Sequence, residues 1–210
     1  MEKSYRNLGY VLLILIPLTL IAFWVTYFSQ FPDFNENINA YHHIHAFIAT
    51  IWILMLIVQP ILIARGNRTL HKTFGKASYV VFPLLILSFV PQMIRMLQSD
   101  YSIYFFFPMA DSILLITFYS LAIIHRKNTA LHMRYMIGTA IVFLAPTLGR
   151  IGPILLGLDP VVSQTILYLV VYMILVLLIT SDRRNKRQFQ PYVYMLMLWM
   201  VHHMAFYMIF

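Results

Sequence analysis

The sequence contains no cysteine. This absence excludes disulfide bonds, thiolate nucleophiles, thiolate metal sites and the covalent attachment of a c-type haem. Any metal or cofactor would therefore have to be bound by histidine, aspartate, methionine or tyrosine side chains.

Charged residues are also scarce: they make up 10% of the 210 residues, whereas 61% are hydrophobic. This composition excludes an ordinary soluble domain and a disordered chain, and it predicts an all-α, polytopic membrane protein. The net charge of +8 does not indicate nucleic acid as a partner, because the short loops cannot form a folded basic surface.

Seven apolar segments are long enough to cross a bilayer, which takes about 20 residues per helix. They cover roughly residues 8–29, 40–64, 76–96, 103–125, 132–156, 161–181 and 190–210. Because all connections are short, residues 1–210 are predicted to form a single seven-helix transmembrane domain without a soluble domain. The first segment has a basic start but no small-x-small cleavage site, so we expect it to be retained as a helix.

The basic residues indicate how these helices are oriented. Of the 15 Lys and Arg residues, 13 fall at the N-terminus or in the second, fourth and sixth connections. They are Lys3, Arg6, Arg65, Arg68, Lys72, Lys76, Arg126, Lys127, Arg134, Arg183, Arg184, Lys186 and Arg187. The other connections carry the acidic residues Asp33, Glu36, Asp100 and Asp159. Because positive loops stay in the cytoplasm, we expect a cytoplasmic N-terminus and an external C-terminus, with the lipid bilayer as partner.

Three histidines, His42, His43 and His45, open the second segment. His45, Trp52 and Gln59 are spaced by seven and therefore lie on one stripe of a helix, with His42 one turn before His45 on nearly the same face. Ionisable groups inside a membrane segment are candidates for function. We therefore expect this stripe to face a protein interior, a cavity or a cofactor.

The outer half of the predicted bundle collects most of the costly polar residues. They are His42, His43, His45, Ser88, Gln92, Arg95, Asp111, Arg150, His202 and His203. An Asp at the centre of a spanning helix costs about 2.5–3.5 kcal/mol on insertion scales, so Asp111 needs a partner. Arg150 and Arg95 are nearest in depth, and such a pair would be either a structural clamp between helices or part of a site.

Haem b needs only two histidines from facing helices at matched depth. His45 with His202 or His203 is the predicted ligand pair. Arg150 or Arg95 would then pair a haem propionate or a substrate anion. On this hypothesis the protein carries out electron transfer or another membrane redox reaction.

A transition metal is the second form of the cofactor prediction, because neutral imidazole binds Zn, Fe and Cu. The candidate metal ligands are His42, His45, Asp111 and His202. The His-x-x-x-His spacing that is common for two ligands on one helix is absent, as are the His-box spacings of membrane di-iron enzymes. Whether the protein is an enzyme stays open.

A second group of histidines, His71, His125 and His132, lies at the predicted cytoplasmic ends among basic residues such as Arg134. A histidine among basic residues at a membrane surface usually contacts lipid headgroups. The functional alternative is that these histidines form a second set of cofactor ligands or a proton path. The further polar site candidates are Gln59, Gln92, His71 and His132.

Two stretches of the chain resemble a family of bacterial membrane proteins of unknown function. In that family a His-bearing helix leads to a Leu-His-x-x-x-Gly-[Arg/Lys] turn, as His45 here leads to Leu70-His71-Lys72-Thr73-Phe74-Gly75-Lys76. The run His132-Met133-Arg134-Tyr135-Met136, ending in Arg150, is similar to the family's second element, His-Arg-x-x-Met followed by an Arg, except that Met133 follows the histidine here.

This resemblance covers roughly half of the chain, and it supplies no activity. It implies a multi-pass protein of the bacterial inner membrane in which His45, His71, His132 and Arg150 matter. Basic turns between His-bearing helices also look like those of b-type cytochromes, which is a likeness of fold alone.

Four hypotheses about function follow. The first, a haem or metal protein for membrane redox chemistry, is favoured because histidine is plentiful relative to acid. The second is a proton-coupled transporter or sensor in which Asp111 and the outer histidines titrate. The others are a zinc membrane hydrolase and a structural subunit or assembly factor whose partners are other membrane subunits.

Overall fold

The computed structural model describes residues 2–34, 38–100 and 102–210, so Glu36 lies outside the described residues. All regular secondary structure in the described residues is helical, which confirms the all-α prediction. Six helices are long and apolar enough to cross a membrane: Ala40–Ala64, Arg68–Leu97, Ser102–Ile124, Thr129–Leu155, Pro160–Arg184 and Gln190–Ile209. Their length and composition are those of a multi-pass helical membrane protein.

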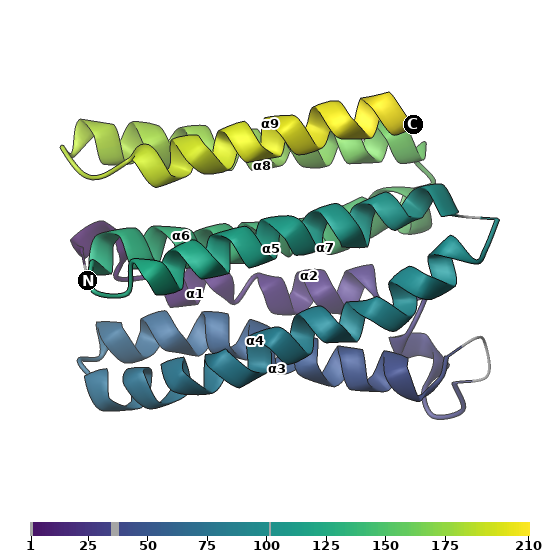
Figure 1. Ribbon diagram of the computed structural model, residues 1–210, viewed down its shortest axis with the longest axis horizontal. Coiled ribbons are helices and arrows are strands. Elements are labelled where there is room, and N and C mark those ends of the chain that lie inside the picture. Colours follow the sequence, from purple (N-terminus) through teal and green to yellow (C-terminus); the bar gives the residue numbers. More distant parts are fainter. Residues whose placement is uncertain (1, 35–37, 101) are drawn as a thin grey trace. The chain divides into compact units, whose positions relative to one another are not determined.

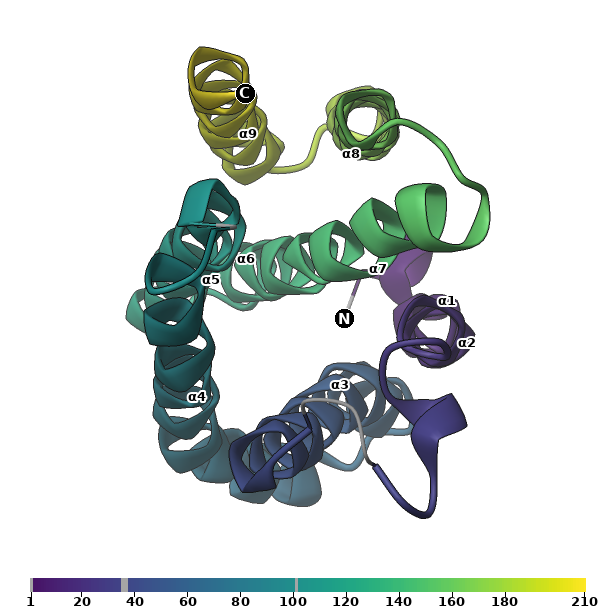
Figure 2. The same ribbon diagram turned by 90° about the vertical axis from the view of Figure 1, so that its right-hand side faces the viewer.

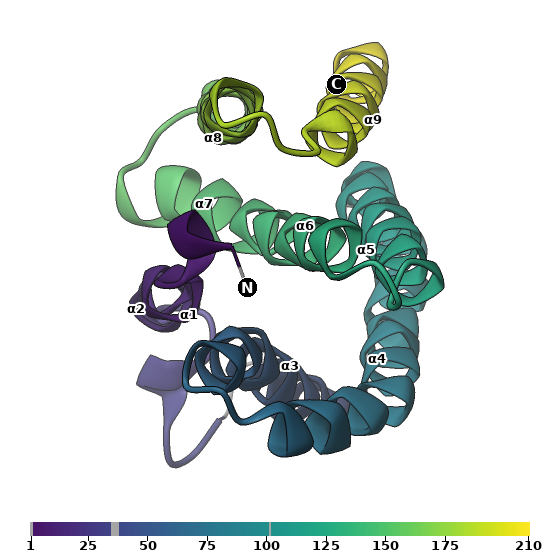
Figure 3. The same ribbon diagram turned by 90° about the vertical axis from the view of Figure 1, so that its left-hand side faces the viewer.

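The chain forms two compact units, Met1–Ser102 (unit 1) and Ile103–Phe210 (unit 2). Unit 1 contains α1 (Leu8–Leu12), α2 (Leu15–Ala22), η2 (Phe28–Gln30), α3 (Ala40–Ala64) and α4 (Arg68–Leu97) (Figure 1). Helix α4 begins eight residues before the predicted residue 76, because Asn67 caps it by accepting a hydrogen bond from the Leu70 N–H at 3.0 Å. Helices α3 and α4 form a hairpin, and α1 lies against α3 (Figure 3).

The first apolar segment differs from its prediction, because its helix ends at Ala22 and not at residue 29. Pro17 separates α1 from α2: it has no N–H to donate to the Leu13 carbonyl, which accepts from the Ile16 N–H at 3.1 Å instead. Beyond Ala22 the chain continues in irregular turns to η2. The helical part, Leu8–Ala22, spans about 22 Å, less than the roughly 30 Å of a bilayer core.

Unit 2 contains two helix pairs. The helices of this unit are α5 (Phe106–Ile124), α6 (Thr129–Val142), α7 (Leu144–Arg150), the π-helical turn η4 (Ile151–Leu155), α8 (Pro160–Arg184) and α9 (Gln190–Ile209). The α5–α6 pair and the α8–α9 pair each form a hairpin, and α9 contacts both α5 and α6 (Figure 2). Helix α7 packs on α8.

The predicted segment 132–156 is interrupted where α6 passes into α7. Pro146 cannot donate to the Val142 carbonyl, and α6 ends at Val142. The second interruption, η4, directly follows Arg150 and contains Pro153. Such π-helical turns occur frequently at functional sites.

Candidate functional site

The predicted stripe on α3 faces the neighbouring helix α4. His45 Nδ1 lies 2.8 Å from Ser88 Oγ, and the rings of Trp52 and Phe82 are 5.1 Å apart. Gln59 Nε2 lies 3.8 Å from the position that a Cβ on Gly75 would take. The stripe therefore faces a protein interior, as the spacing of seven predicts, and the helix that covers it is α4.

The outer ends of α3 and α4 continue this series of contacts. Gln92 is a hydrogen-bonding neighbour of His42, and Arg95 Nη1 donates to Tyr41 Oη at 3.2 Å. His42 Nδ1 also accepts the Asn39 N–H at 3.2 Å, at the start of α3. The structure thus brings these predicted site residues together, and their contacts tie α3 to α4.

In unit 2 a buried carboxylate meets a buried imidazole. Asp111 Oδ1 of α5 lies 3.4 Å from His202 Nε2 of α9, and the two side chains are 12% and 3% exposed. On the other side of the imidazole, Tyr168 Oη of α8 lies 2.9 Å from His202 Nδ1. Three helices therefore supply one group each to a chain of polar contacts, which we call the Asp111 site.

Aromatic rings enclose the imidazole of the Asp111 site. The rings of Phe106 and Trp199 lie 5.0 and 5.2 Å from that of His202. An isolated charge in such apolar surroundings is costly, and it is tolerated when a partner of opposite charge is adjacent. The enclosure therefore favours two arrangements, the ion pair and the neutral pair, which differ in the position of one proton.

The contact between Asp111 and His202 is longer than a charge-assisted hydrogen bond. Neither Asp111 Oδ1 nor His202 Nε2 makes a well-aligned hydrogen bond, and charge-assisted bonds are usually about 2.7–2.9 Å long. Buried polar atoms without a hydrogen bond call for an explanation, and functional use is one of them. The geometry allows the pair to hold a proton on either side chain without locking it there.

Further polar groups extend from the Asp111 site. Gln164, one turn before Tyr168 on α8, has a buried Nε2 without a hydrogen bond, and a Cβ on Gly149 would lie 3.4 Å from its Oε1. His203 Nδ1 lies 2.8 Å from Tyr172 Oη, and its ring stacks on that of Tyr168 at 4.0 Å. These groups continue the polar surface along α8 towards α7.

The predicted pairing of Asp111 with Arg150 is wrong. Within the described part of unit 2, the ionisable group that contacts Asp111 is the His202 imidazole. Arg150 is the last residue of α7 and is half-buried. The depth of a residue in the membrane, counted along its helix, does not determine which helices face each other. The packing of α9 on α5 brings His202 to the Asp111 carboxylate.

The histidines of the inner layer bind backbone carbonyls. His132 Nδ1 lies 2.8 Å from the Ala122 carbonyl oxygen, and His125 Nδ1 lies 2.9 Å from that of Leu121. Both carbonyls belong to the last turn of α5, and the Leu121 carbonyl also accepts the His125 backbone N–H at 3.0 Å. These two imidazoles therefore cap α5, whereas His71 is half-buried in the first turn of α4.

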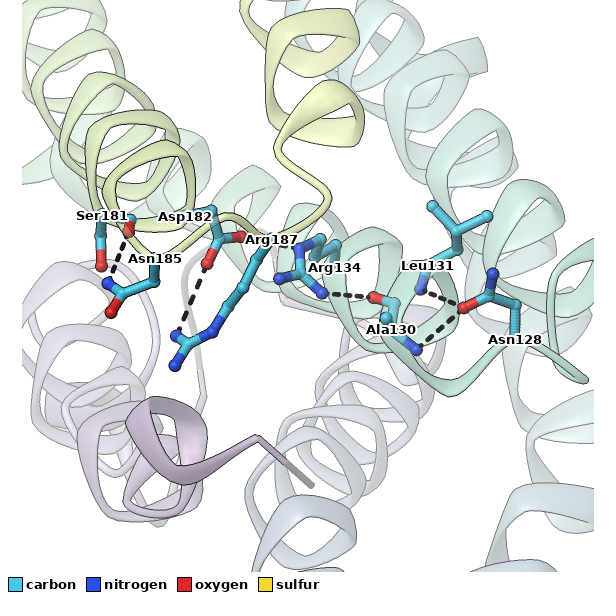
Figure 4. A network of polar contacts seen from close by, with 8 residues as sticks. All are labelled: Asn128, Ala130, Leu131, Arg134, Ser181, Asp182, Asn185 and Arg187. Carbon is cyan, nitrogen blue, oxygen red and sulfur yellow. Dashed lines mark hydrogen bonds and ion pairs between the residues drawn. The ribbon is translucent and has the colours of Figure 1, made fainter.

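Sequence reasoning missed an ion cluster at the other end of unit 2 (Figure 4). Arg134 Nε donates to Asp182 Oδ2 at 2.7 Å, and both side chains are 0% exposed. Arg187 Nη1 lies 3.9 Å from Asp182 Oδ1. By sequence, Arg134 counts only among the basic residues at the predicted cytoplasmic ends; the signal that could have found the cluster is an acid at the end of an apolar helix, directly before Arg183 and Arg184.

The predicted metal and haem ligands are divided between the two units. His42 and His45 belong to unit 1, and Asp111, His202 and His203 belong to unit 2. Across residues 2–34, 38–100 and 102–210, no group of three or more His, Asp or Glu side chains lies together as a metal site. The haem pair that joins His45 to His202 or His203 stays a prediction.

Comparison of the chain with protein-family models, curated proteins and solved structures gave no match. The function must therefore be argued from the arrangement of its own residues.

Proposed function

We propose that the chain is a seven-pass protein of the bacterial inner membrane, with its N-terminus in the cytoplasm and its C-terminus outside. Six helices have the length and composition of membrane spans, and α1–α2 with the following turns to Gln30 would supply the remaining crossing. The distribution of Lys and Arg supports the orientation. The bacterial membrane rests on the resemblance to a bacterial family.

Within that membrane, we propose that the protein is a proton-coupled transporter or sensor whose proton-binding site is the Asp111 site. The observation that carries this proposal is the buried, loosely held contact between Asp111 Oδ1 and His202 Nε2 at 3.4 Å. Chains of Asp, Glu and His in membrane helices are typical of proton relays.

A proton at this site changes the attraction between two helices. With the proton on His202, the imidazolium and the Asp111 carboxylate form an ion pair between α9 and α5. When Asp111 takes up a further proton from solvent or substrate while His202 keeps its own, a neutral carboxyl faces the imidazolium and a weaker contact replaces the ion pair. Proton occupancy thus acts on the packing of α5 and α9, and a ligand can shift a conformational equilibrium only through such a difference between states.

Tyr168 extends the site beyond the imidazole. Its hydroxyl lies 2.9 Å from His202 Nδ1, so it fixes the ring orientation and is placed to pass a proton to or from that nitrogen. The side chain is 0% exposed. We therefore assign Asp111 and His202 to proton binding and Tyr168 to positioning and relay.

Infrared difference spectroscopy between acidic and alkaline buffer tests this proposal without a known substrate. A buried, protonated carboxyl has a C=O band at higher frequency than one in water. We expect the purified wild-type protein to show such a band and the Asp111→Asn variant to lack it. Asp159→Asn, which removes an exposed carboxylate at the N-cap of α8, is the matched control and should keep the band. An unchanged band in Asp111→Asn would overturn the proposal.

A second candidate function, membrane redox chemistry with haem b, is favoured by one observation on His203. Its Nδ1 is oriented by Tyr172, and its Nε2 is buried without a hydrogen bond. Metal-bound histidines usually have this arrangement, with an oxygen partner on the second nitrogen. His202 suits iron less well, because its Nε2 faces Asp111. His45 would be the other ligand, and Arg150 or Arg95 the partner of a propionate.

Absorption spectra of the oxidised and dithionite-reduced protein test this candidate. A Soret band that shifts on reduction and is lost in His203→Ala would support it. A colourless protein with no metal in elemental analysis would remove it. Stoichiometric zinc without colour would instead favour the hydrolase hypothesis.

A further inference from the structure

The buried face of α8 is polar at both ends and apolar between them. Tyr168, Val171, Leu175 and Asp182 lie on this face, and each side chain is 0% exposed. Tyr168 belongs to the Asp111 site, and Asp182 belongs to the ion cluster. Their separation of 14 positions corresponds to about 21 Å along the helix.

Helix α9 repeats this order. Met195 and Trp199 form its wholly buried middle, and His202 lies at one end in the Asp111 site. At the other end, the Arg134 guanidinium lies 6.0 Å from the centre of the Tyr192 ring. Both helices therefore have an apolar middle with a polar cluster at each end.

The ion cluster joins three parts of unit 2 at one point. Arg134 of α6 binds Asp182 of α8, and Arg187 reaches the same carboxylate from the α8–α9 connection. Arg134 Nη1 also donates to the Ala130 carbonyl of its own helix at 3.0 Å. The cluster, drawn in Figure 4, therefore connects the α5–α6 pair with the α8–α9 pair.

Two arginines lie near the Asp182 carboxylate, at different distances from it. Arg134 is fully buried at 2.7 Å, whereas Arg187 is 23% exposed at 3.9 Å. If α6 moves away from α8, Arg187 is placed to take over the carboxylate, so the acid keeps a partner in both positions. Arg187 thus gives the carboxylate a neighbour of opposite charge that does not belong to α6.

We propose that the Arg134–Asp182–Arg187 cluster is a gate that closes the interface between α6 and the α8–α9 pair. The gate opens when Asp182 exchanges Arg134 for Arg187. This inference rests on the proposed function, since it assigns to the proton-coupled protein the second gate that alternating access needs. Opening exposes the apolar middle of α8, beginning with Leu175 and Val171.

Because the chain has no cysteine, a single introduced cysteine can report opening. Val171→Cys places a thiol of similar volume at a site that is 0% exposed. The gate is removed by the double change Arg134→Met and Asp182→Leu, which removes both fully buried charges and leaves the partly exposed Arg187 in place. In lipid vesicles, a charged maleimide should label Cys at position 171 at least about tenfold faster in the double variant, as expected of a local opening.

The matched control is Ala22→Cys, which is 2% exposed in unit 1 and should stay protected in the same double variant. If the cysteine at position 171 stays protected from maleimide in the double variant, the proposal that the cluster is a gate is wrong.

If both reporter cysteines react, the double variant has lost its fold, and the gate proposal is then tested by a second measurement. With the ion cluster intact, Asp111→Asn should change the labelling rate of Val171→Cys by about threefold or more, because the two gates are coupled. An unchanged rate would overturn the gate. The infrared band of Asp111 is read separately, so the proposed function can stand when the gate fails.

Discussion

Asp111 and Asp182 are two buried acids of the same unit, and their environments are opposite. Asp182 lies 2.7 Å from a fully buried guanidinium, with a second arginine nearby. Asp111 lies 3.4 Å from one imidazole, and neither of the two facing atoms makes a well-aligned hydrogen bond. One carboxylate is held by arginines, whose charge is permanent, whereas the other faces an imidazole, which can be charged or neutral.

The difference separates two uses of a buried acid. An arginine stays charged, so the contacts of the Asp182 carboxylate are mechanical: they hold helices together. A histidine can gain or lose a proton, so the Asp111 contact can change its charge state without leaving its place. From this contrast we expect changes at Asp182 to affect stability most, and changes at Asp111 to affect proton binding most.

The largest effect is expected for Asp182→Ala. It leaves the Arg134 guanidinium buried without its carboxylate, which should lower the free energy of unfolding by about 3–5 kcal/mol. Reversible unfolding in mixed detergent micelles measures this loss. The double variant Arg134→Met with Asp182→Leu should recover most of it, because both fully buried charges are removed together. A single variant as stable as the wild type would erase the contrast between the two acids.

An intermediate effect is expected for Tyr168→Phe. Removing the hydroxyl leaves His202 Nδ1 buried without its partner, which should cost about 1–3 kcal/mol of unfolding free energy. It should also alter the infrared band of Asp111, because the imidazole loses its orientation. Tyr172→Phe, which removes the hydroxyl beside His203, is the control. Equal spectral changes in both variants would argue against a chain from Tyr168 to Asp111.

The smallest effect is expected for Arg187→Met. The guanidinium is 23% exposed and lies 3.9 Å from the carboxylate, and partly exposed ion pairs contribute about 0–1 kcal/mol. The same unfolding assay measures this change. A loss as large as that of Asp182→Ala would show that both arginines hold the carboxylate equally, and the exchange between them would lose its basis.

The parts of this fold that depend on one helix at a time could be predicted from the sequence. The lengths of the apolar segments predicted six spanning helices, and most of the predicted helix ends lie within a few residues of the observed ends. The spacing of seven predicted that His45, Trp52 and Gln59 share one face of their helix, and this face meets α4. The early end of the first helix at Ala22 was not predicted, because Pro17 and the irregular turns act locally within an apolar run.

Contacts between distant segments could not be predicted. Asp111 was a candidate, but its partner is His202, 91 residues later, and not Arg150. Arg134 and Asp182 are 48 residues apart, and the positive-inside pattern by itself places Arg134 at the headgroups. Which helices pack together depends on the summed fit of many side chains, and a depth count along the chain does not contain that information.

The central claim is that the Asp111 carboxyl exchanges a proton and the Asp182 carboxyl does not. Carbon-13 labelling of the aspartate carboxyls, with assignment by Asp111→Asn and Asp182→Asn, allows both to be followed by NMR in one purified sample. Between alkaline and mildly acidic buffer, we predict that the Asp111 resonance moves and the Asp182 resonance stays. A stationary Asp111 resonance, or a shift of Asp182 alone, would contradict the account.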